Sequence, residues 1–349
     1  MWLIVGDVHW SEYSSIYRKR GTKFSKRLEN LINTVNWIEE TAETYNCERI
    51  IFLGDFFDRN ELNANELTAL QFVQWSDIPH DFLVGNHEGL MNDLSTSSAH
   101  LLSLIPNVRV IDSPLLDVGY GYRVLYLPYM LEQDRQPLRT YFNQLSAGYF
   151  TTQEVKQNII FSHNDLKIQY GLIESKIGFD VDEIEKGCDL FINGHLHNGS
   201  KFCKNGYNIG NCSGQNFSEN AAVYAHNIML LEPRTLELQL IENPYALNFY
   251  KVEYSSIDQL YALIDSIKDN SIVSVKLPQE YVAEAKNILN TTDKVKDFRV
   301  VSTVKKVENA EEVEQLEMVN HLDEFVKFVR ENIEVSNLVA EELSEVCKQ

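Results

Sequence analysis

The sequence has 349 residues, of which 44% are hydrophobic and 23% are charged, as in ordinary globular proteins. This length exceeds what one hydrophobic core usually supports, so we expect one large domain with an appendage, or two domains. No apolar run approaches the ~20 residues of a membrane span, and the formal net charge of −20 argues against binding nucleic acid by overall charge alone. The five cysteines are scattered without a Cys-x-x-Cys motif, which favours a reducing, cytoplasmic location.

The first two thirds of the chain predict alternating strands and helices. A short apolar strand over 2–5 precedes an amphipathic helix over 26–45, whose apolar residues recur at spacings of three and four. A buried strand follows in RIIFLGD (49–55), and the next helix, over 63–75, has Asn63 as its predicted N-cap. Later strands are predicted in DFLVGN (81–86), RVLYLP (123–128), NIIFSH (158–163) and DLFINGH (189–195). Near-continuous apolar strands between helices indicate a sheet covered on both faces, in a layered α/β fold.

The pattern changes after Pro244. Residues 250–304 predict the order strand, helix, strand, helix, strand, which is a small α/β module. The acidic stretch ENAEEVEQ (308–315) then leads to two predicted amphipathic helices, with apolar residues repeated over 322–333 and 335–346. Residues 311–349 contain eleven acidic and three basic side chains. We therefore predict three parts, with bounds 1–245, 246–306 and 307–349.

Five predicted strand ends in the first part finish in polar residues that can bind a metal. They are GDVH (6–9), GDFFD (54–58), GNHE (85–88), SH (162–163) and GHLH (194–197). The carboxyl ends of strands in a covered α/β sheet form the crevice in which ligands bind. Each motif alone has an ordinary explanation as a turn or a structural histidine. Five of them in one crevice would carry a large desolvation cost unless cations were bound there, so the sequence predicts a metal site.

The candidate ligands are too many for one ion. They are Asp7, His9, Asp55, Asn86, His163, His195 and His197. A carboxylate such as that of Asp55 can bridge two ions ~3.5–4 Å apart. Imidazole, carboxylate and amide ligands suit Mn²⁺, Fe²⁺ or Zn²⁺ rather than Ca²⁺, and the lack of thiolates argues against structural zinc. Because two such ions activate water and neutralise a phosphate, the set indicates phosphoester hydrolysis.

The five motifs, in this order over 6–197, resemble the calcineurin-like metallophosphoesterase superfamily. GDFFDR and GNHE are similar to the serine/threonine phosphatases and dinucleoside tetraphosphatases, but those enzymes have Gly where this chain has Trp10 and Asn60. GHLH, the stretch NIGNCSGQNFSEN (208–220) and the small module instead resemble the SbcD, or MRE-eleven-type, nucleases. The compact size is most similar to the bacteriophage recombination nuclease subunits.

This resemblance implies a layered metallophosphoesterase sandwich with a small α/β capping domain and a helical tail. The implied activity is a two-metal DNA phosphodiesterase, with 3′→5′ exonuclease action on duplexes and endonuclease action on single strands. One Mn²⁺ would be held by Asp7, His9, Asp55 and His197, and the other by Asp55, Asn86, His163 and His195. His87 would protonate the leaving 3′ oxygen. The expected partners are DNA, an SbcC-like coiled-coil ATPase bound by the C-terminal helices, and a second copy in a homodimer, in the cytoplasm of the cell or of a phage host.

Asp58 departs from the nuclease pattern, because cellular SbcD-type enzymes usually carry His at this position. By resemblance to the phosphatase branch, Asp58 should not bind metal but should hydrogen-bond His87 across the crevice. A carboxylate partner favours the imidazolium form, which suits a general acid. The alternative is that Asp58 caps the following turn near Asn60 and Asn63.

Basic residues are concentrated in YRKRGTKFSKR (17–27), which has six basic and no acidic side chains. Arg18, Lys19 and Arg20 are candidates for contacts with DNA phosphates, although a solvated loop is the simpler interpretation. Two alternatives for the whole chain remain. A protein phosphatase or dinucleoside polyphosphate hydrolase would have no use for residues 250–349. A metal-free scaffold should lack some of the metal ligands, but all seven candidate ligands are present.

Overall fold

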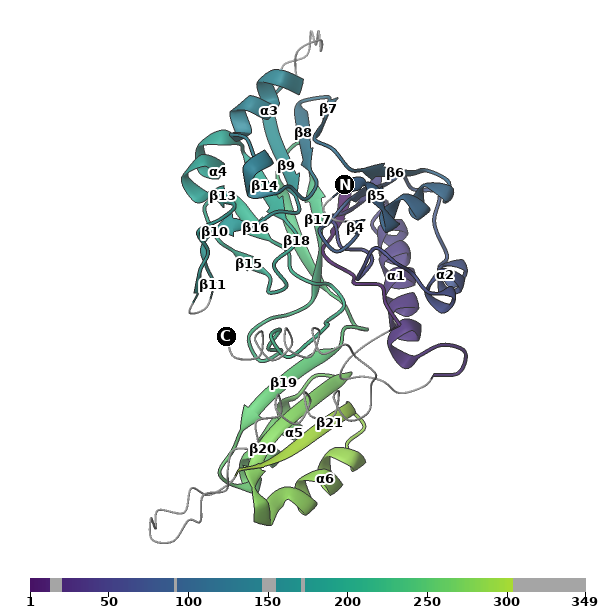
Figure 1. Cartoon of the computed structure of the whole chain (residues 1–349), viewed down its shortest axis with the longest axis vertical. Helices are drawn as coiled ribbons and strands as arrows, with labels where there is room; N and C mark the ends of the chain where they lie inside the picture. Colours follow the sequence, from purple (N-terminus) through teal and green to yellow (C-terminus); the bar gives the residue numbers. More distant parts are fainter. Residues whose placement is uncertain (13–20, 91–92, 146–154, 171–172, 304–349) are drawn as a thin grey trace, which may run out of the picture. The chain divides into compact units, whose positions relative to one another are not determined.

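The computed structural model describes residues 1–12, 21–90, 93–145, 155–170 and 173–303 (Figure 1). The candidate DNA contacts Arg18, Lys19 and Arg20 and the predicted tail over 307–349 therefore lie outside the described residues. Among the described residues, no helix combines the length and the apolar character needed to cross a membrane.

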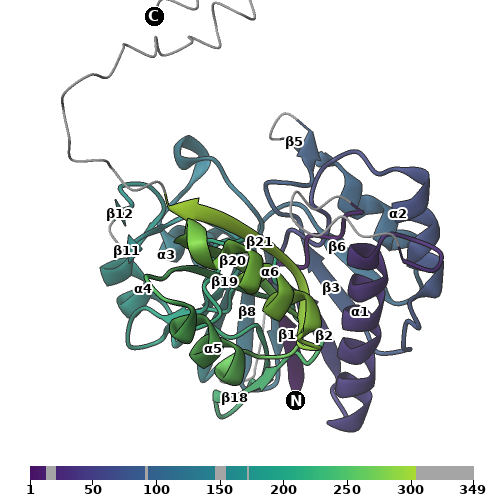
Figure 2. The same cartoon turned by 90° about the horizontal axis from the view of Figure 1, so that it is seen from below.

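The first of two large sheets has six strands in the order β18–β17–β1–β2–β3–β6. They span Trp2–Val5 (β1), Arg49–Phe52 (β2), His80–Leu83 (β3), Val108–Ile111 (β6), Asn227–Glu232 (β17) and Glu237–Glu242 (β18). Strands β1, β2, β3 and β6 are parallel, and β17 runs antiparallel to β1. Helix α1 (Lys26–Thr44) runs beside this sheet (Figure 2) and buries Leu31 and Val35 in one cluster with Val5 and Phe52.

The second large sheet has the order β15–β16–β14–β9–β8–β7. Its strands span Leu115–Gly119 (β7), Tyr122–Leu127 (β8), Gln157–Ser162 (β9), Leu190–Asn193 (β14), Ser200–Lys201 (β15) and Gly206–Asn208 (β16). Helices α3 (Leu138–Leu145) and α4 (Val181–Gly187) pack on one face. Ile4 and Ile51 of the first sheet share a buried cluster with Val124 and Ile192 of the second. The predicted layered α/β sandwich is confirmed. One face of each sheet is covered by the other sheet, and the opposite face is covered by helices.

Helix α2 (Ala64–Ala69) is shorter than the predicted helix over 63–75. Its predicted start is right, because the Asn63 side chain accepts hydrogen bonds from the main-chain N–H groups of Asn65 and Glu66. The chain then forms a 3₁₀ turn, η1 (Leu70–Phe72), instead of continuing the helix. The Asn36 side chain on α1 accepts from the Gln74 N–H at 2.8 Å, which removes this donor from a longer helix. A tertiary contact therefore ends the helix.

The small module follows the predicted order of elements. Strands β19 (Asn248–Glu253), β20 (Ser271–Pro278) and β21 (Val295–Thr303) form a parallel sheet, with helices α5 (Ile257–Ser266) and α6 (Val282–Thr291) between them. Leu260 of α5 and Leu289 of α6 share a core with Val273 and Val275 of β20. The domain bounds at 245 and 306 stay a prediction.

The remaining elements are short. The strands are β4 (Gly89–Leu90), β5 (Asp93–Ser97), β10 (Leu166–Lys167), β11 (Gln169–Tyr170), β12 (Ile173–Glu174) and β13 (Phe179–Asp180). The other 3₁₀ helices are η2 (Ser98–Leu104), η3 (Glu132–Asp134) and η4 (Gln279–Tyr281).

Candidate metal centre

The carboxyl ends of five parallel strands supply the candidate ligands, and these strands belong to both large sheets. Asp7, Asp55 and Asn86 follow β1, β2 and β3 of the first sheet, whereas His163 and His195 follow β9 and β14 of the second. Packing of the two sheets brings these loops together, so the site is built across the sandwich.

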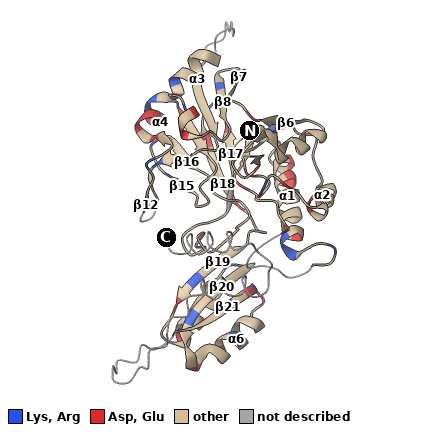
Figure 3. Ribbon diagram, viewed as in Figure 1, with Lys and Arg blue, Asp and Glu red and all other residues tan. Residues whose placement is uncertain are grey.

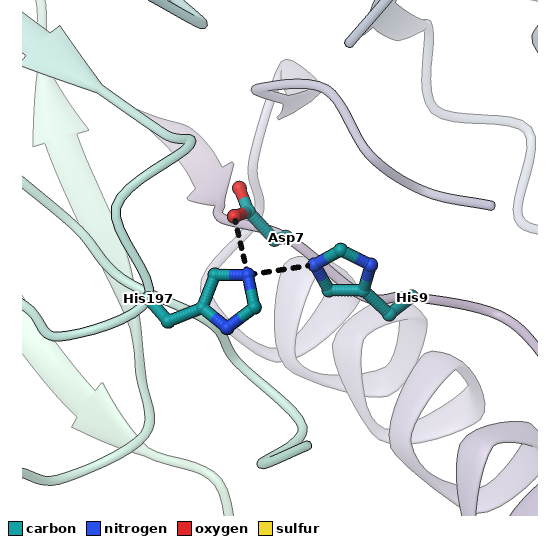
Figure 4. Close-up of side chains that lie close together, drawn as sticks. All are labelled: Asp7, His9 and His197. Atoms are coloured by element: carbon teal, nitrogen blue, oxygen red, sulfur yellow. Dashed lines mark hydrogen bonds and ion pairs between the residues drawn. The ribbon is translucent and has the colours of Figure 1, made fainter. Parts of the chain in front are cut away.

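One cluster contains Asp7, His9 and His197 (Figure 4). The Nε2 atoms of His9 and His197 lie 3.0 Å apart, and Nε2 of His197 lies 3.9 Å from Oδ2 of Asp7. Asp7 is fully buried, and its Oδ2 has no hydrogen-bond partner among the described residues. Two imidazole nitrogens and an unsatisfied buried carboxylate oxygen are a donor set that fits a divalent cation.

A second cluster contains Asp55, His163 and His195, with Asn86 beside them. The Asn86 side-chain oxygen lies 3.2 Å from Nε2 of His163 and 3.0 Å from Nδ1 of His195. Oδ2 of Asp55 lies 3.1 Å from Nε2 of His163. A carboxylate, an amide oxygen and two imidazoles therefore lie close together. Borderline divalent ions such as Mn²⁺, Fe²⁺ and Zn²⁺ prefer such a mixed set of ligands.

Asp55 links the two clusters through His9, since its carboxylate also forms a third close group, within 4.8 Å, with His9 and His87. Burial opposes its charge, yet His163, His9 and His87 hold the pKa of Asp55 well below its usual value. Burial likewise disfavours a charged His163, but Asp55 and Asp7 raise the pKa of His163 to about 9. Asp55 is therefore ionised at neutral pH, as a bridging ligand must be.

Each of the four candidate histidine ligands is held by a second group through the ring nitrogen that faces away from its cluster. The contacts are His9 Nδ1 with Asp58 Oδ1 (3.0 Å), His163 Nδ1 with the Leu53 carbonyl (2.6 Å), His195 Nε2 with Asp165 Oδ1 (3.1 Å) and His197 Nδ1 with Glu219 Oε1 (2.8 Å). Such partners fix the tautomer and the ring orientation of histidines that bind metals. The opposite nitrogen of each ring is left to face the cluster.

A sequence profile for calcineurin-like phosphoesterases matches residues 2–199, which is more than half of the chain. The chain belongs to the calcineurin-like phosphoesterase family. Members of this family are hydrolases that use two divalent metal ions, and the two clusters, which Asp55 links through His9, fit such a pair. A search of curated proteins finds no significant match to the sequence.

In this phosphoesterase, three candidate ligands adopt a left-handed backbone that non-glycine residues seldom occupy. The φ angles are 52° at His9, 48° at Asp55 and 73° at His195. Gly54 also has a positive φ, and a Cβ there would lie 2.4 Å from Nδ1 of His163. Strained backbone of this kind persists where the surrounding structure imposes it, and it is concentrated at functional sites.

The expected hydrogen bond between the Asp58 carboxylate and His87 is wrong. Asp58 Oδ1 lies 3.0 Å from His9 Nδ1 and accepts from Gln215 Nε2 at 2.7 Å, whereas His87 Nδ1 bonds the main-chain carbonyl of Asp58 at 2.9 Å. His9 is buried and His87 is exposed, so water screens the attraction between the carboxylate and His9 less than it would screen one with His87. Asn63 caps helix α2, and the alternative that Asp58 caps the turn before it stays a prediction.

Glu88, the last residue of GNHE, joins two ligand loops of the phosphoesterase. Its buried carboxylate accepts from the N–H groups of Gly85 at 2.8 Å and Phe57 at 3.0 Å. Burial and the nearby Asp55 charge raise the pKa of Glu88 to about 7. Glu88 therefore joins the loops after β2 and β3 beside Asp55.

Two partners of the histidines were missed in the sequence, Asp165 and Glu219. Asp165 lies two residues after the SH motif, and Glu219 lies near the end of NIGNCSGQNFSEN, a stretch that we used only for its resemblance. Burial opposes the charge on Glu219, but the hydrogen bond with His197 and nearby imidazoles hold its pKa below the usual value. The signal that was available is local only for Asp165, which lies beside a histidine motif.

The basic run is not one solvated surface. Arg27 is only 3% exposed, and it donates to the Gly214 carbonyl at 2.7 Å and to Ser213 Oγ at 3.0 Å. Burial lowers the pKa of Arg27 to about 10. Lys23 lies over the Phe72 ring, 3.9 Å from its centre. Arg27 therefore supports the loop beside the metal centre and is not available to DNA.

Proposed function

We propose that this phosphoesterase is a two-metal DNA phosphodiesterase, the nuclease subunit of an SbcCD-like recombination and repair complex. The observation that carries the proposal is the division of the GHLH motif between the two clusters. His197 faces Asp7 and His9, whereas His195 faces Asn86 beside Asp55. By resemblance, this use of both histidines is typical of the phosphodiesterase branch of the superfamily.

The residues have distinct proposed roles. Asp7, His9 and His197 would hold one ion, Asn86, His163 and His195 would hold the other, and the Asp55 carboxylate would be available to both. The pair of ions, for which we propose Mn²⁺, supplies an activated water and neutralises charge on the phosphate when bound. The protein's part is to keep these ligands buried and oriented before substrate arrives.

His87 is the proposed general acid. Its Nδ1 is engaged by the Asp58 carbonyl at 2.9 Å, which leaves Nε2 as the nitrogen that can hold a proton for substrate. Its ring is exposed and lies 4.9 Å from the His9 ring, centre to centre, at the edge of the clusters. A proton delivered from Nε2 would leave with the 3′ oxygen of the cleaved phosphodiester.

The small module supports a polymeric, anionic substrate. Tyr250 and Val252 of β19 point into its core, so Lys251 lies on the opposite face of the sheet. Lys251, Lys276 and Arg299 are exposed on three adjacent strands, and Figure 3 shows basic positions on β19 and β20. Lys276 also pairs with Glu253 at 3.0 Å. Because Glu253 offsets Lys276, the local positive charge on this face comes from Lys251 and Arg299, in a protein of net charge −20.

The remaining partners follow from the same proposal. An SbcC-like coiled-coil ATPase would bind the predicted helices of 307–349, where an amphipathic stripe needs a surface to cover it. A second copy of the chain would complete a homodimer. Arg18, Lys19 and Arg20 stay predicted phosphate contacts.

The proposal is tested with the purified full chain, Mn²⁺ and 5′-labelled duplex DNA. We expect a ladder that shortens from the 3′ end, cleavage of circular single strands, and no reaction with EDTA. A phosphoserine peptide and a dinucleoside tetraphosphate are offered under the same conditions. Hydrolysis of either of these without cleavage of DNA would replace the nuclease proposal with a phosphatase or a dinucleoside polyphosphate hydrolase. If the purified chain does not bind Mn²⁺, the result would support the alternative of a metal-free scaffold.

A further inference from the structure

We propose that Glu219 and Gln215 are positioning residues that lock the imidazoles of His9 and His197 together around one metal ion. The inference rests on the two-metal centre of the proposed function but not on DNA as the substrate. Neither residue belongs to the five strand-end motifs, and both come from the loop after β16.

A closed ring of contacts carries the inference. On one side, Glu219 Oε1 lies 2.8 Å from His197 Nδ1, and Glu219 Oε2 accepts from the Gln215 main-chain N–H at 2.8 Å. On the other side, Gln215 Nε2 donates to Asp58 Oδ1 at 2.7 Å, and this oxygen lies 3.0 Å from His9 Nδ1. The Nε2 atoms of the two histidines then face each other at 3.0 Å, which closes the ring.

The ring determines which nitrogen each histidine presents. A carboxylate accepts hydrogen bonds and cannot donate, so Glu219 requires the N–H of His197 at Nδ1. Asp58 Oδ1 lies 3.0 Å from His9 Nδ1 as an ion-pair contact, and this charge favours a proton on the same nitrogen of His9. Both Nε2 lone pairs are thereby directed at the space beside Asp7. Gln215 links the two carboxylates, because its main chain contacts Glu219 and its side chain contacts Asp58.

The burial of Glu219 argues against a role in stability alone. The side chain is fully buried, and a buried charge usually contributes less to stability than an apolar side chain of similar size. Both of its oxygens are used within the ring or next to it, since Oε2 also lies 4.0 Å from Nε2 of His226. A carboxylate at this position therefore serves the orientation of His197.

The loop that carries both residues is anchored at each end. Before Gln215, the Gly214 carbonyl accepts from the buried Arg27 at 2.7 Å. After Glu219, the Ala221 N–H donates to the Phe249 carbonyl of β19 at 2.9 Å. Between the two residues, the Phe217 ring packs edge-on against the Phe249 ring. Because both ends of the loop are fixed, Glu219 and Gln215 hold the two imidazoles in place before a metal ion binds.

The test measures metal binding to the full chain without DNA. Mn²⁺ is titrated into EDTA-treated, dialysed protein, and free Mn²⁺ is followed by electron paramagnetic resonance. We expect two ions per chain in the wild type. In Glu219→Ala one of the two should bind about 10- to 100-fold more weakly while the other is unchanged, as for other partners of histidine ligands. Gln215→Ala should weaken the same ion by less, and Glu219→Gln, which keeps an acceptor oxygen, should restore part of the affinity.

Glu39→Gln is the matched control, because Glu39 is another buried acid, 2.9 Å from the buried His80 at the amino end of β3. It should leave both affinities unchanged. Unchanged Mn²⁺ binding in a folded Glu219→Ala would overturn the inference, as would equal weakening of both ions. Circular dichroism checks folding, and if Glu219→Ala does not fold, the same criteria are applied to Gln215→Ala, whose side chain is only partly buried. If the wild-type chain binds Mn²⁺ as expected but does not cleave DNA, that result contradicts the proposed function and leaves this inference intact.

Discussion

The carboxylate of Asp58 lies 3.0 Å from Nδ1 of His9, whereas His87 contacts only the main-chain carbonyl of Asp58. Asp58 thus acts on a candidate metal ligand, and the candidate general acid keeps a partner that no side-chain substitution removes. The two residues that we had expected to form one proton-transfer pair therefore have separable roles.

Asp58→Asn should weaken the binding of one Mn²⁺ about 10- to 100-fold, because the amide supports the His9 tautomer less well than the carboxylate does. At saturating Mn²⁺, turnover and the alkaline side of the pH–rate profile should match the wild type. The measurement is the rate of DNA cleavage against Mn²⁺ concentration and pH. A displaced alkaline limb at saturating metal would restore the carboxylate as the partner of His87.

Asp55→Ala should abolish DNA cleavage and lower Mn²⁺ occupancy at both positions, since this carboxylate belongs to the second cluster and also lies close to His9 of the first. Folding should survive, because one apolar cluster holds helix α1 on the first sheet and another holds the two sheets together, and Asp55 belongs to neither. Metal content after dialysis and the far-ultraviolet circular dichroism spectrum give the two readouts. Full activity in this variant contradicts a shared bridging ligand.

His87→Ala should reduce turnover by ~10²–10⁴-fold, as expected for loss of a proton donor, with Mn²⁺ affinity unchanged. A nucleotide p-nitrophenyl ester releases a stable anion that needs no proton. The variant should therefore hydrolyse this ester at nearly the wild-type rate. Equal losses on both substrates would assign His87 to binding and not to proton transfer.

The pH dependence of stability follows from His163, whose pKa is raised to about 9 beside Asp55. A raised pKa stabilises the fold fully below the unfolded value, ~6.5, and this contribution disappears as the pH rises through about 9. With EDTA present, the unfolding temperature should fall over this window. With excess Mn²⁺ the trend should reverse, because metal binding requires the neutral imidazole. His163→Gln should flatten both curves.

A chain that ends at Asn309 should stay soluble, keep its basal Mn²⁺-dependent activity, and lose co-purification with an SbcC-like ATPase. The reason is that the amphipathic helices predicted after this residue would cover their apolar stripes on the partner. Co-expression with affinity capture measures the complex. Aggregation of the shortened chain would indicate instead that the helices pack on the chain itself.

The amino-acid sequence determined the parts of the site that depend on local chemistry. Asp7, Asp55 and Asn86 each come directly after a glycine that follows an apolar strand. Parallel strands bring such ends to the same edge of a sheet. The start of α2 was equally local, since Asn63 and Glu66 cap it within four residues. The seven candidate ligands were therefore predictable as a group, and the structure brings them into two adjoining clusters.

Tertiary structure alone decided what holds those ligands. Glu219 meets His197 and Gln215 meets Asp58 only because the loop after β16 returns to the crevice, and no spacing in the sequence encodes that path. The same reason explains the error at Asp58, whose carboxylate turned to the buried His9 and not to the exposed His87. Hydrogen-bond partners are chosen by burial and loop direction, which emerge only when the two sheets pack.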